Sequence, residues 1–271
     1  MLAGCSHARP VARAGHAPST SASPAPSTSV TTVPPDPAAG VATKLQTVET
    51  GIGDPATPAS QLPGLGEAQQ DLEAALVEDA GLYSRVSALL PEPVRSAVAS
   101  DVTAGVDLER LTPPRPTLPP WHIVAPAPAD ELQRDYREAE AAFGVPWAYL
   151  AAIHLVETRM GRIRGPSSAG AQGPMQFLPS TWARYGQGDI NSDHDSILAA
   201  ARYLHANGAP ADMAGALYHY NHSALYVDAV SRYARRMLAD PRAYLGYYHW
   251  QVRYRLTGGR VVVLPVGWHN P

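Results

Sequence analysis

The chain has 271 residues, which is long enough to bury a sizeable hydrophobic core. Its formal net charge of −3 gives no electrostatic case for binding nucleic acid. A single cysteine excludes an internal disulfide, and no apolar run reaches the length of a membrane-spanning helix. Because the 27 prolines are distributed unevenly, we expect less than the full length to fold.

The one cysteine lies in the segment Leu2-Ala3-Gly4-Cys5. This segment resembles the lipobox of bacterial lipoproteins, in which a signal peptide is removed before the cysteine and the thiol is then lipidated. We therefore interpret residues 1–5 as the remnant of such a signal and Cys5 as the lipidation site. No charged or apolar region precedes the motif, so the alternatives are a start codon further upstream or a chance match.

Two segments of different character follow. Residues 6–60 are rich in Ala, Pro, Ser and Thr and bury too little surface to offset their ordering entropy, which predicts a disordered tether. Over 65–110, apolar residues recur at helical spacing, from Leu72 and Leu76 to Val98 and Val102. This pattern predicts a small helical segment without a chemical signature, followed by a proline-rich connector.

The remainder is expected to be a helical domain over 126–247 with a hairpin extension over 248–271. The expected helices are 131–143 capped by Asp130, one that Pro146 opens and that ends at Gly161, a short one capped by Ser180, one capped by Asp195 and ended by Gly208, 213–220, and one that starts at Ser223. Beyond Tyr247 the apolar period changes to two, so Trp250–Leu256 and Val261–Val266 are expected to pair through Gly258-Gly259. The fold class is therefore α+β and mostly α.

Glu157 is the candidate catalytic residue, because it lies near the end of an apolar helix. A carboxylic acid can protonate a leaving group near neutral pH only if its pKa is raised above the usual value of about 4.3. Burial beside Ile153 and the negative end of the helix dipole both favour the protonated form. Arg159 would oppose this if it pointed inward, and we expect it to point to solvent. The alternative is an ordinary surface glutamate.

A glycine-rich run, Ser167–Trp182, follows this helix. Gly170 and Gly173 permit backbone conformations that are closed to other residues, so the chain can turn beside the helix end and leave polar groups for a ligand. Gln176 offers both a donor and an acceptor. A plain surface loop is the alternative. The candidate ligand-contacting residues of this loop are Ser168, Met175, Gln176 and Phe177, with the two apolar residues as a wall.

The sequence contains a partial calcium-binding pattern and no zinc-binding pattern. Asp189–Asp195 places Asp, Asn and Asp at alternate positions, as at the start of a calcium loop. The glycine and the glutamate that such a loop requires are replaced by His194 and Ala200. Asp195 is better explained as a helix cap. Because the ten histidines show no zinc-ligand spacing, no metal and no other cofactor is expected.

Three segments together carry a family resemblance: the helix ending near Glu157, the Gly-Pro-Met-Gln-Phe-Leu-Pro run, and Ala-Leu-Tyr-His-Tyr-Asn-His at 216–222. They resemble the lysozyme-like lytic transglycosylases with a soluble-lytic-transglycosylase type of domain, which cleave bacterial cell-wall glycan. The resemblance covers residues 126–247 and is closest to the membrane-bound B type and its actinobacterial relatives. Thr158, where many members have Ser, and His222-Ser223 depart from the pattern and leave the cleavage preference open.

The resemblance implies a lysozyme-like fold in which Tyr220 and Asn221 lie at the floor of a cleft opposite the Glu157 acid. Tyr226 is a lesser candidate for contact with the acid or the sugar. Glu157 would protonate the bond between N-acetylmuramic acid and N-acetylglucosamine, and then take the proton of the muramoyl 6-hydroxyl as a 1,6-anhydro ring closes. The implied protein is an extracytoplasmic monomer, lipid-anchored to the membrane, that acts on peptidoglycan strands.

Two alternatives stay open from the sequence. One is a muramidase, which would use water in place of the 6-hydroxyl. The other is a wall-binding module whose groove is inactive, although Glu157, Gln176 and Asn221 argue against it. The sequence supplies no second acid beside Glu157, since the nearby candidates, Asp189, Asp193 and Asp195, are interpreted as loop and cap residues.

Overall fold

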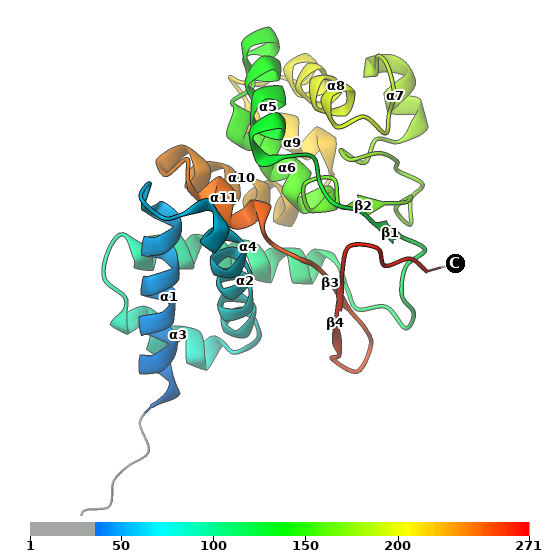
Figure 1. Cartoon of the computed structure of the whole chain (residues 1–271). Helices are drawn as coiled ribbons and strands as arrows, with labels where there is room; N and C mark the ends of the chain where they lie inside the picture. Colours follow the sequence, from blue (N-terminus) through cyan, green and yellow to red (C-terminus); the bar gives the residue numbers. More distant parts are fainter. Residues whose placement is uncertain (1–35, 271) are drawn as a thin grey trace, which may run out of the picture. The chain divides into compact units, whose positions relative to one another are not determined.

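Two sets of helices contact each other in the described part of the chain, residues 36–270 of a computed structural model (Figure 1). The first set consists of α1 (Pro37–Gly53), the single-turn helix η1 (Ala59–Gln61), α2 (Leu62–Glu78), α3 (Ala80–Leu89) and α4 (Val94–Leu111). The second consists of α5 (Ala129–Phe143), α6 (Trp147–Thr158), α7 (Pro179–Tyr185), α8 (Asp193–Ala206), α9 (Met213–Tyr220), α10 (Ala224–Ala239) and α11 (Ala243–Tyr248).

Strands are few and short. β1 (His122–Ile123) pairs antiparallel with β2 (Ile163–Arg164), and β3 (Val252–Arg255) with β4 (Val261–Leu264). The β3–β4 pair is the expected hairpin, with Gly258 and Gly259 at positive φ in its turn. The β1–β2 pair was not expected, because β1 lies within the proline-rich connector. The prediction of a mostly α fold with a C-terminal hairpin is confirmed.

Helix α1 corrects the predicted tether. The tether over 6–60 is wrong from residue 37 onward, since Pro37–Gly53 is helical. Asp36 caps this helix by accepting a hydrogen bond from the N–H of Ala38 at 3.0 Å. Leu45, Val48 and Ile52 then form a buried stripe at helical spacing. The alanine-rich composition suggested a low-complexity segment, but alanine is also the residue with the highest helix propensity. Residues 6–35 and Cys5 lie outside the described residues.

The helical segment predicted over 65–110 becomes α2, α3 and α4, and it packs against the second set of helices. Leu45, Leu76, Val86 and Val98 belong to a hydrophobic cluster shared by α1 to α4. Helix α4 also lies against α10, and α2 lies against α11. The first set of helices is therefore joined to the second by direct helix–helix contacts.

Three predicted helix caps are wrong. Helix α7 begins at Pro179 after Leu178, so Ser180 lies inside its first turn. Helix α5 begins after Pro128, so Asp130 lies inside its first turn. At α8 the cap is Ser192, whose hydroxyl accepts the N–H of Asp195 at 3.2 Å. The Asp195 carboxylate accepts the backbone N–H of Asp189 at 2.9 Å. It therefore fixes the loop before the helix and leaves the helix end to the serine.

Helix α6 lies at the centre of the second set of helices and carries the candidate acid near its end (Figure 1). Leu150, Ile153 and Leu155 are all fully buried although they point in different directions around the helix. A helix that is apolar on every side is buried on every side, and α5, α8, α10 and α11 all contact it. Among residues 36–270, no helix combines the length and apolar character that a membrane span requires.

Candidate active site

Glu157 lies in the last turn of α6, where its side chain is half-buried. Its Oε1 accepts a hydrogen bond of 2.8 Å from the Tyr226 hydroxyl. Burial raises the pKa of Glu157 to about 7, and the hydrogen bond from Tyr226 opposes that rise only in part. A substantial fraction of this carboxyl is therefore protonated near neutral pH, as a general acid requires.

Two tyrosines, the buried Tyr226 and the half-buried Tyr220, connect the acid to the elements around it. Tyr226 lies near the start of α10, and its ring is parallel to that of Tyr220 with the centroids 6.4 Å apart. The Tyr220 hydroxyl donates to the carbonyl of Met175 at 2.6 Å. Burial and the charge of Glu157 hold the pKa of both phenols well above 10, so both remain hydrogen-bond donors. Tyr226 thus joins α10 to α6, and Tyr220 joins α9 to the glycine-rich loop.

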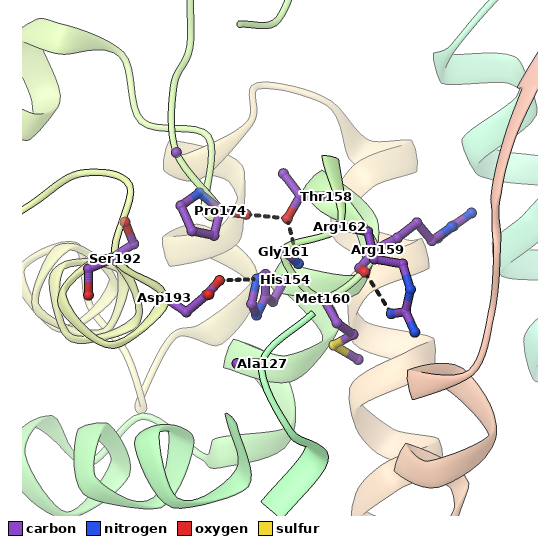
Figure 2. A network of polar contacts seen from close by, with 12 residues as sticks. Ala127, His154, Thr158, Arg159, Met160, Gly161, Arg162, Pro174, Ser192 and Asp193 are labelled. Carbon is purple, nitrogen blue, oxygen red and sulfur yellow. Dashed lines mark hydrogen bonds and ion pairs between the residues drawn. The ribbon is translucent and has the colours of Figure 1, made fainter. Parts of the chain in front are cut away.

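Thr158 ties the end of α6 to the same loop. Its hydroxyl donates to the Pro174 carbonyl at 2.6 Å and accepts the Gly161 N–H at 3.1 Å (Figure 2). Gly173, at φ +75°, leaves no room for a side chain, because a Cβ there would lie 2.0 Å from the Ile190 carbonyl oxygen. The hydroxyl at position 158 therefore holds the loop against the end of α6, and the absence of a side chain at position 173 lets the loop lie against the segment before α8.

The loop residues expected to contact a ligand fall into two groups. Met175 and Phe177 are fully or almost fully buried, so the expectation that their side chains wall a cleft is wrong. They anchor the loop in the core, where Phe177 packs against Trp182 and Tyr220. Gln176 is half-buried, and its Nε2 donates to the Gly173 carbonyl at 2.8 Å. The Nε2 group of Gln176 therefore closes the turn from Gly173 to Gln176. The side-chain Oε1 is the atom that a ligand could contact.

Ser168 and Asn221 occupy more open positions. Ser168 is exposed, next to Ser167, whose hydroxyl accepts the N–H groups of Ala169 and Ala171. Asn221 is half-buried at the end of α9, where its backbone N–H donates to the Leu217 carbonyl. Neither is hydrogen-bonded to Glu157, whose partner within residues 36–270 is Tyr226. Tyr226, the lesser candidate of the two tyrosines, is thus the residue that contacts the acid.

Arg159 does not point to solvent as expected. Its guanidinium donates to the Leu155 carbonyl at 3.1 Å and lies over the ring of Trp250, 5.6 Å from the centroid. The residue caps α6 in the left-handed conformation, at φ +53°. Burial and the Tyr226 hydrogen bond, not this cation, act on the pKa of Glu157. The acid therefore keeps its raised pKa although an arginine lies two residues away.

A buried polar network lies one turn before Glu157 on α6 (Figure 2). His154 Nδ1 is 2.7 Å from the Tyr136 hydroxyl, and its Nε2 is 3.3 Å from Asp193 Oδ1. Asp193 Oδ2 accepts from Arg164 at 3.1 Å. Burial acts to raise the pKa of Asp193, but His154 and Arg164 outweigh it and hold that pKa below its usual value. The network joins α5, α6, α8 and β2.

The three aspartates of the segment 189–195 all make contacts within the protein. The interpretation of Asp193 as a loop or cap residue is wrong, because its carboxylate is the centre of the network described above. Asp195 fixes the loop, and Asp189 accepts the N–H of Asn191 at 2.9 Å. Among the residues that the structure describes, no carboxylate is one of the groups that shift the pKa of Glu157. Within the described residues no His, Cys, Asp or Glu cluster could hold a metal ion.

Comparison with known proteins gives one informative similarity. The chain is 30% identical over 122 residues to a protein of Thiobacillus denitrificans (strain ATCC 25259 / T1) named membrane-bound lytic murein transglycosylase F. The similar region is 42% of this chain and 26% of that relative. No family model matches the chain, and no solved structure matches it. The similarity supports the resemblance to lytic transglycosylases. It does not support the narrower resemblance to the B type and its actinobacterial relatives.

Proposed function

We propose that this protein is a peptidoglycan lytic transglycosylase in which Glu157 is both the acid and the base. The observation that carries the proposal is the half-buried Glu157 carboxyl, with its pKa raised to about 7 and Tyr226 bonded to one oxygen. The similarity to a lytic murein transglycosylase supports the substrate class.

The proposed reaction begins with protonated Glu157. Tyr226 occupies Oε1, which leaves Oε2 to carry the proton toward the glycosidic oxygen. As the bond from muramoyl C1 to that oxygen breaks, the proton moves to the leaving N-acetylglucosamine. The Glu157 carboxylate then accepts the proton of the muramoyl 6-hydroxyl, and the oxygen of that hydroxyl bonds to muramoyl C1. The 1,6-anhydro ring closes, and Glu157 is protonated again for the next cycle.

The same geometry favours ring closure over hydrolysis. Retaining and inverting glycosidases ordinarily place a second carboxyl about 5–9.5 Å from the acid, to act as nucleophile or to activate water. Here no carboxylate influences the pKa of Glu157, and Asp193 and Asp195 are engaged in other contacts. The 6-hydroxyl of the substrate is then the available nucleophile. A muramidase remains the second candidate, and product analysis separates the two.

Replacement of Glu157 by Gln tests the role of the acid. Gln keeps the size of the side chain and can accept from Tyr226, but it cannot donate the proton. We expect release of soluble muropeptides from purified sacculi to fall by at least about 10²-fold, the usual contribution of general acid catalysis. Retention of more than about a tenth of the wild-type rate would overturn the assignment of Glu157.

We also propose that the protein works in the cell envelope, as a monomer anchored through lipidated Cys5. The Leu-Ala-Gly-Cys segment and the name of the membrane-bound relative support this. The test is to express the gene from its genomic start and to fractionate the cells. Wild-type protein should sediment with membranes and Cys5→Ala protein should not. Equal membrane recovery of both would contradict the anchor.

A further inference from the structure

Three buried carboxyl groups meet where the first set of helices contacts the second. Glu49 on α1, Glu73 on α2 and Asp101 on α4 are exposed by only 5%, 4% and 2%. Acidic side chains are almost never buried to this degree unless they are paired. The proposed reaction uses none of them, so their burial calls for a separate explanation.

The partners of this carboxyl cluster (Glu49, Glu73 and Asp101) are too few for three negative charges. Arg236 on α10 donates to Glu49 at 2.7 Å, and Gln69 donates to the other oxygen of Glu49 at 2.6 Å. The Tyr247 hydroxyl donates to one oxygen of Asp101 at 2.5 Å. The second oxygen of Asp101 and both oxygens of Glu73 are buried without a donor partner. One guanidinium therefore serves three carboxyls.

A shared proton resolves this shortage of donors. Glu73 and Asp101 each have a buried carboxyl oxygen without a partner, and a proton on one of them would supply a donor that this site lacks. Burial, then Asp101 and Glu49, raise the pKa of Glu73 well above its usual value. Burial and Glu49 raise the pKa of Asp101 to about 7. Two adjacent carboxyls cannot both ionise at low cost, so the pair retains a proton near neutral pH.

The remaining charged and titratable groups around the cluster belong to α10 and α11. Arg236 is itself shared with Asp240. The three carboxyls come from α1, α2 and α4. The groups that face them from the other side are Tyr233 and Arg236 of α10, Asp240 directly after α10, and Tyr247 of α11. Both tyrosines stay protonated because burial raises their pKa, so the carboxyl protons are the ones that titrate.

Contacts lead from this junction to the candidate acid. Trp250 donates from its ring nitrogen to Gln69 of α2 at 3.1 Å, and its ring lies beneath the Arg159 guanidinium. Arg159 follows Glu157 by two residues. Helix α10 itself carries Tyr226, which is bonded to Glu157. Release of α1 to α4 would therefore remove support from both sides of the acid.

We propose that the helices α1 to α4 dock on α10 and α11 through carboxyl groups that share a proton, so that docking weakens as the surroundings become alkaline. The proposal does not rest on the enzymatic reaction, because it concerns how two sets of helices hold together. Its direction follows from the burial, because loss of the shared proton leaves a third negative charge in a buried site with one arginine. Docking is full below the ordinary pKa of a carboxyl and is lost as pH rises through the raised values.

Hydrogen exchange of the whole protein, measured between pH 6 and 8.5, tests the proposal. Rates are corrected for the intrinsic pH dependence of amide exchange. We expect protection in α1, α2 and α4 to fall by about tenfold for each pH unit over which one proton is released. Protection in α8, which lies against α5 away from the junction, should stay unchanged. Equal pH dependence in both regions, or none in either, would overturn the proposal.

The variant Glu73→Gln sharpens the test, because it keeps the donor that protonated Glu73 supplies and cannot ionise. Its α1, α2 and α4 protection should match wild type at pH 6 and lose most of the decline above pH 7. Glu67→Gln, an exposed position on the same helix, should behave as wild type. If Glu73→Gln does not fold, Asp101→Asn is measured in the same way with the same expectation. A variant that keeps the full wild-type decline would contradict the proposal.

Discussion

The Tyr226 hydroxyl donates a hydrogen bond to Glu157 Oε1 at 2.8 Å, and this bond joins the start of α10 to the end of α6. It engages Oε1 within the protein and leaves Oε2 for the proposed substrate. It also lowers the pKa that burial has raised, so the acid titrates near neutral pH.

Removal of that hydroxyl should move the pH profile of the reaction. In Tyr226→Phe the pKa of Glu157 rises above about 7, because burial then acts without the opposing hydrogen bond. The alkaline limb of kcat/KM on sacculi should shift to higher pH, while the stability falls by about 1 kcal/mol. Tyr218→Phe, at an exposed position of α9, is the control. An unmoved limb, or one moved to lower pH, is the result that this account does not allow.

Glu157 should also affect stability in a pH-dependent way. Its pKa is raised in the folded state, so the folded protein binds the proton more tightly than the unfolded chain. The free energy of unfolding therefore decreases as pH rises from about 4.5 to about 7 through this group. Glu157→Gln should match wild type at pH 4.5 and be more stable by about 1–3 kcal/mol at pH 8. Urea unfolding at the two pH values measures the difference, and equal differences at both would contradict it.

Thr158 should be sensitive to loss of its hydroxyl and tolerant of loss of its methyl group. Thr158→Val leaves the buried Pro174 carbonyl and Gly161 N–H without their partner, which should cost about 1–3 kcal/mol. Thr158→Ser keeps both hydrogen bonds and should stay within about 1 kcal/mol of wild type. Thermal unfolding compares the two variants. A serine variant as unstable as the valine variant would show that packing, not the hydroxyl, holds the loop.

The acidic segment should show unequal effects on stability and none on the product. Asp193→Asn leaves His154 and Arg164 without their anion and should cost about 3 kcal/mol or more, as for a broken buried pair. Asp195→Asn loses a carboxylate that accepts one backbone N–H and should cost about 1 kcal/mol. Both variants should release the same anhydro product from sacculi. A change of product in either would identify a catalytic carboxylate.

The sequence predicted the elements that local signals define. Helix α5 ends at Phe143 as expected, followed by Gly144 in the left-handed conformation, and the Gly258-Gly259 turn forms the expected hairpin. Helix α1 was missed because its alanines suggested low complexity, while its buried stripe becomes visible only once α2 and α4 are in place. Helix α11 was missed because it is a single short segment between a helix and a strand.

The candidate acid could be predicted, but most of its surroundings could not. Glu157 follows from the helix end and the motifs after it, whereas the partner of its carboxylate lies on another helix and depends on packing. Arg159 was placed in solvent because nothing in the local sequence indicates that Trp250 lies beneath it. The same reason explains the carboxyl cluster, whose members come from three helices and carry no shared motif.

The most direct test of the central claim is digestion of purified sacculi in heavy-oxygen water, followed by mass spectrometry of the muropeptides. The account predicts 1,6-anhydromuramoyl ends, each one water lighter than the hydrolysis product, with no heavy oxygen at muramic C1. Glu157→Gln protein, as the matched control, should give neither product. Heavy oxygen at C1 of the wild-type product would show that water is the nucleophile, and would replace the transglycosylase with a muramidase.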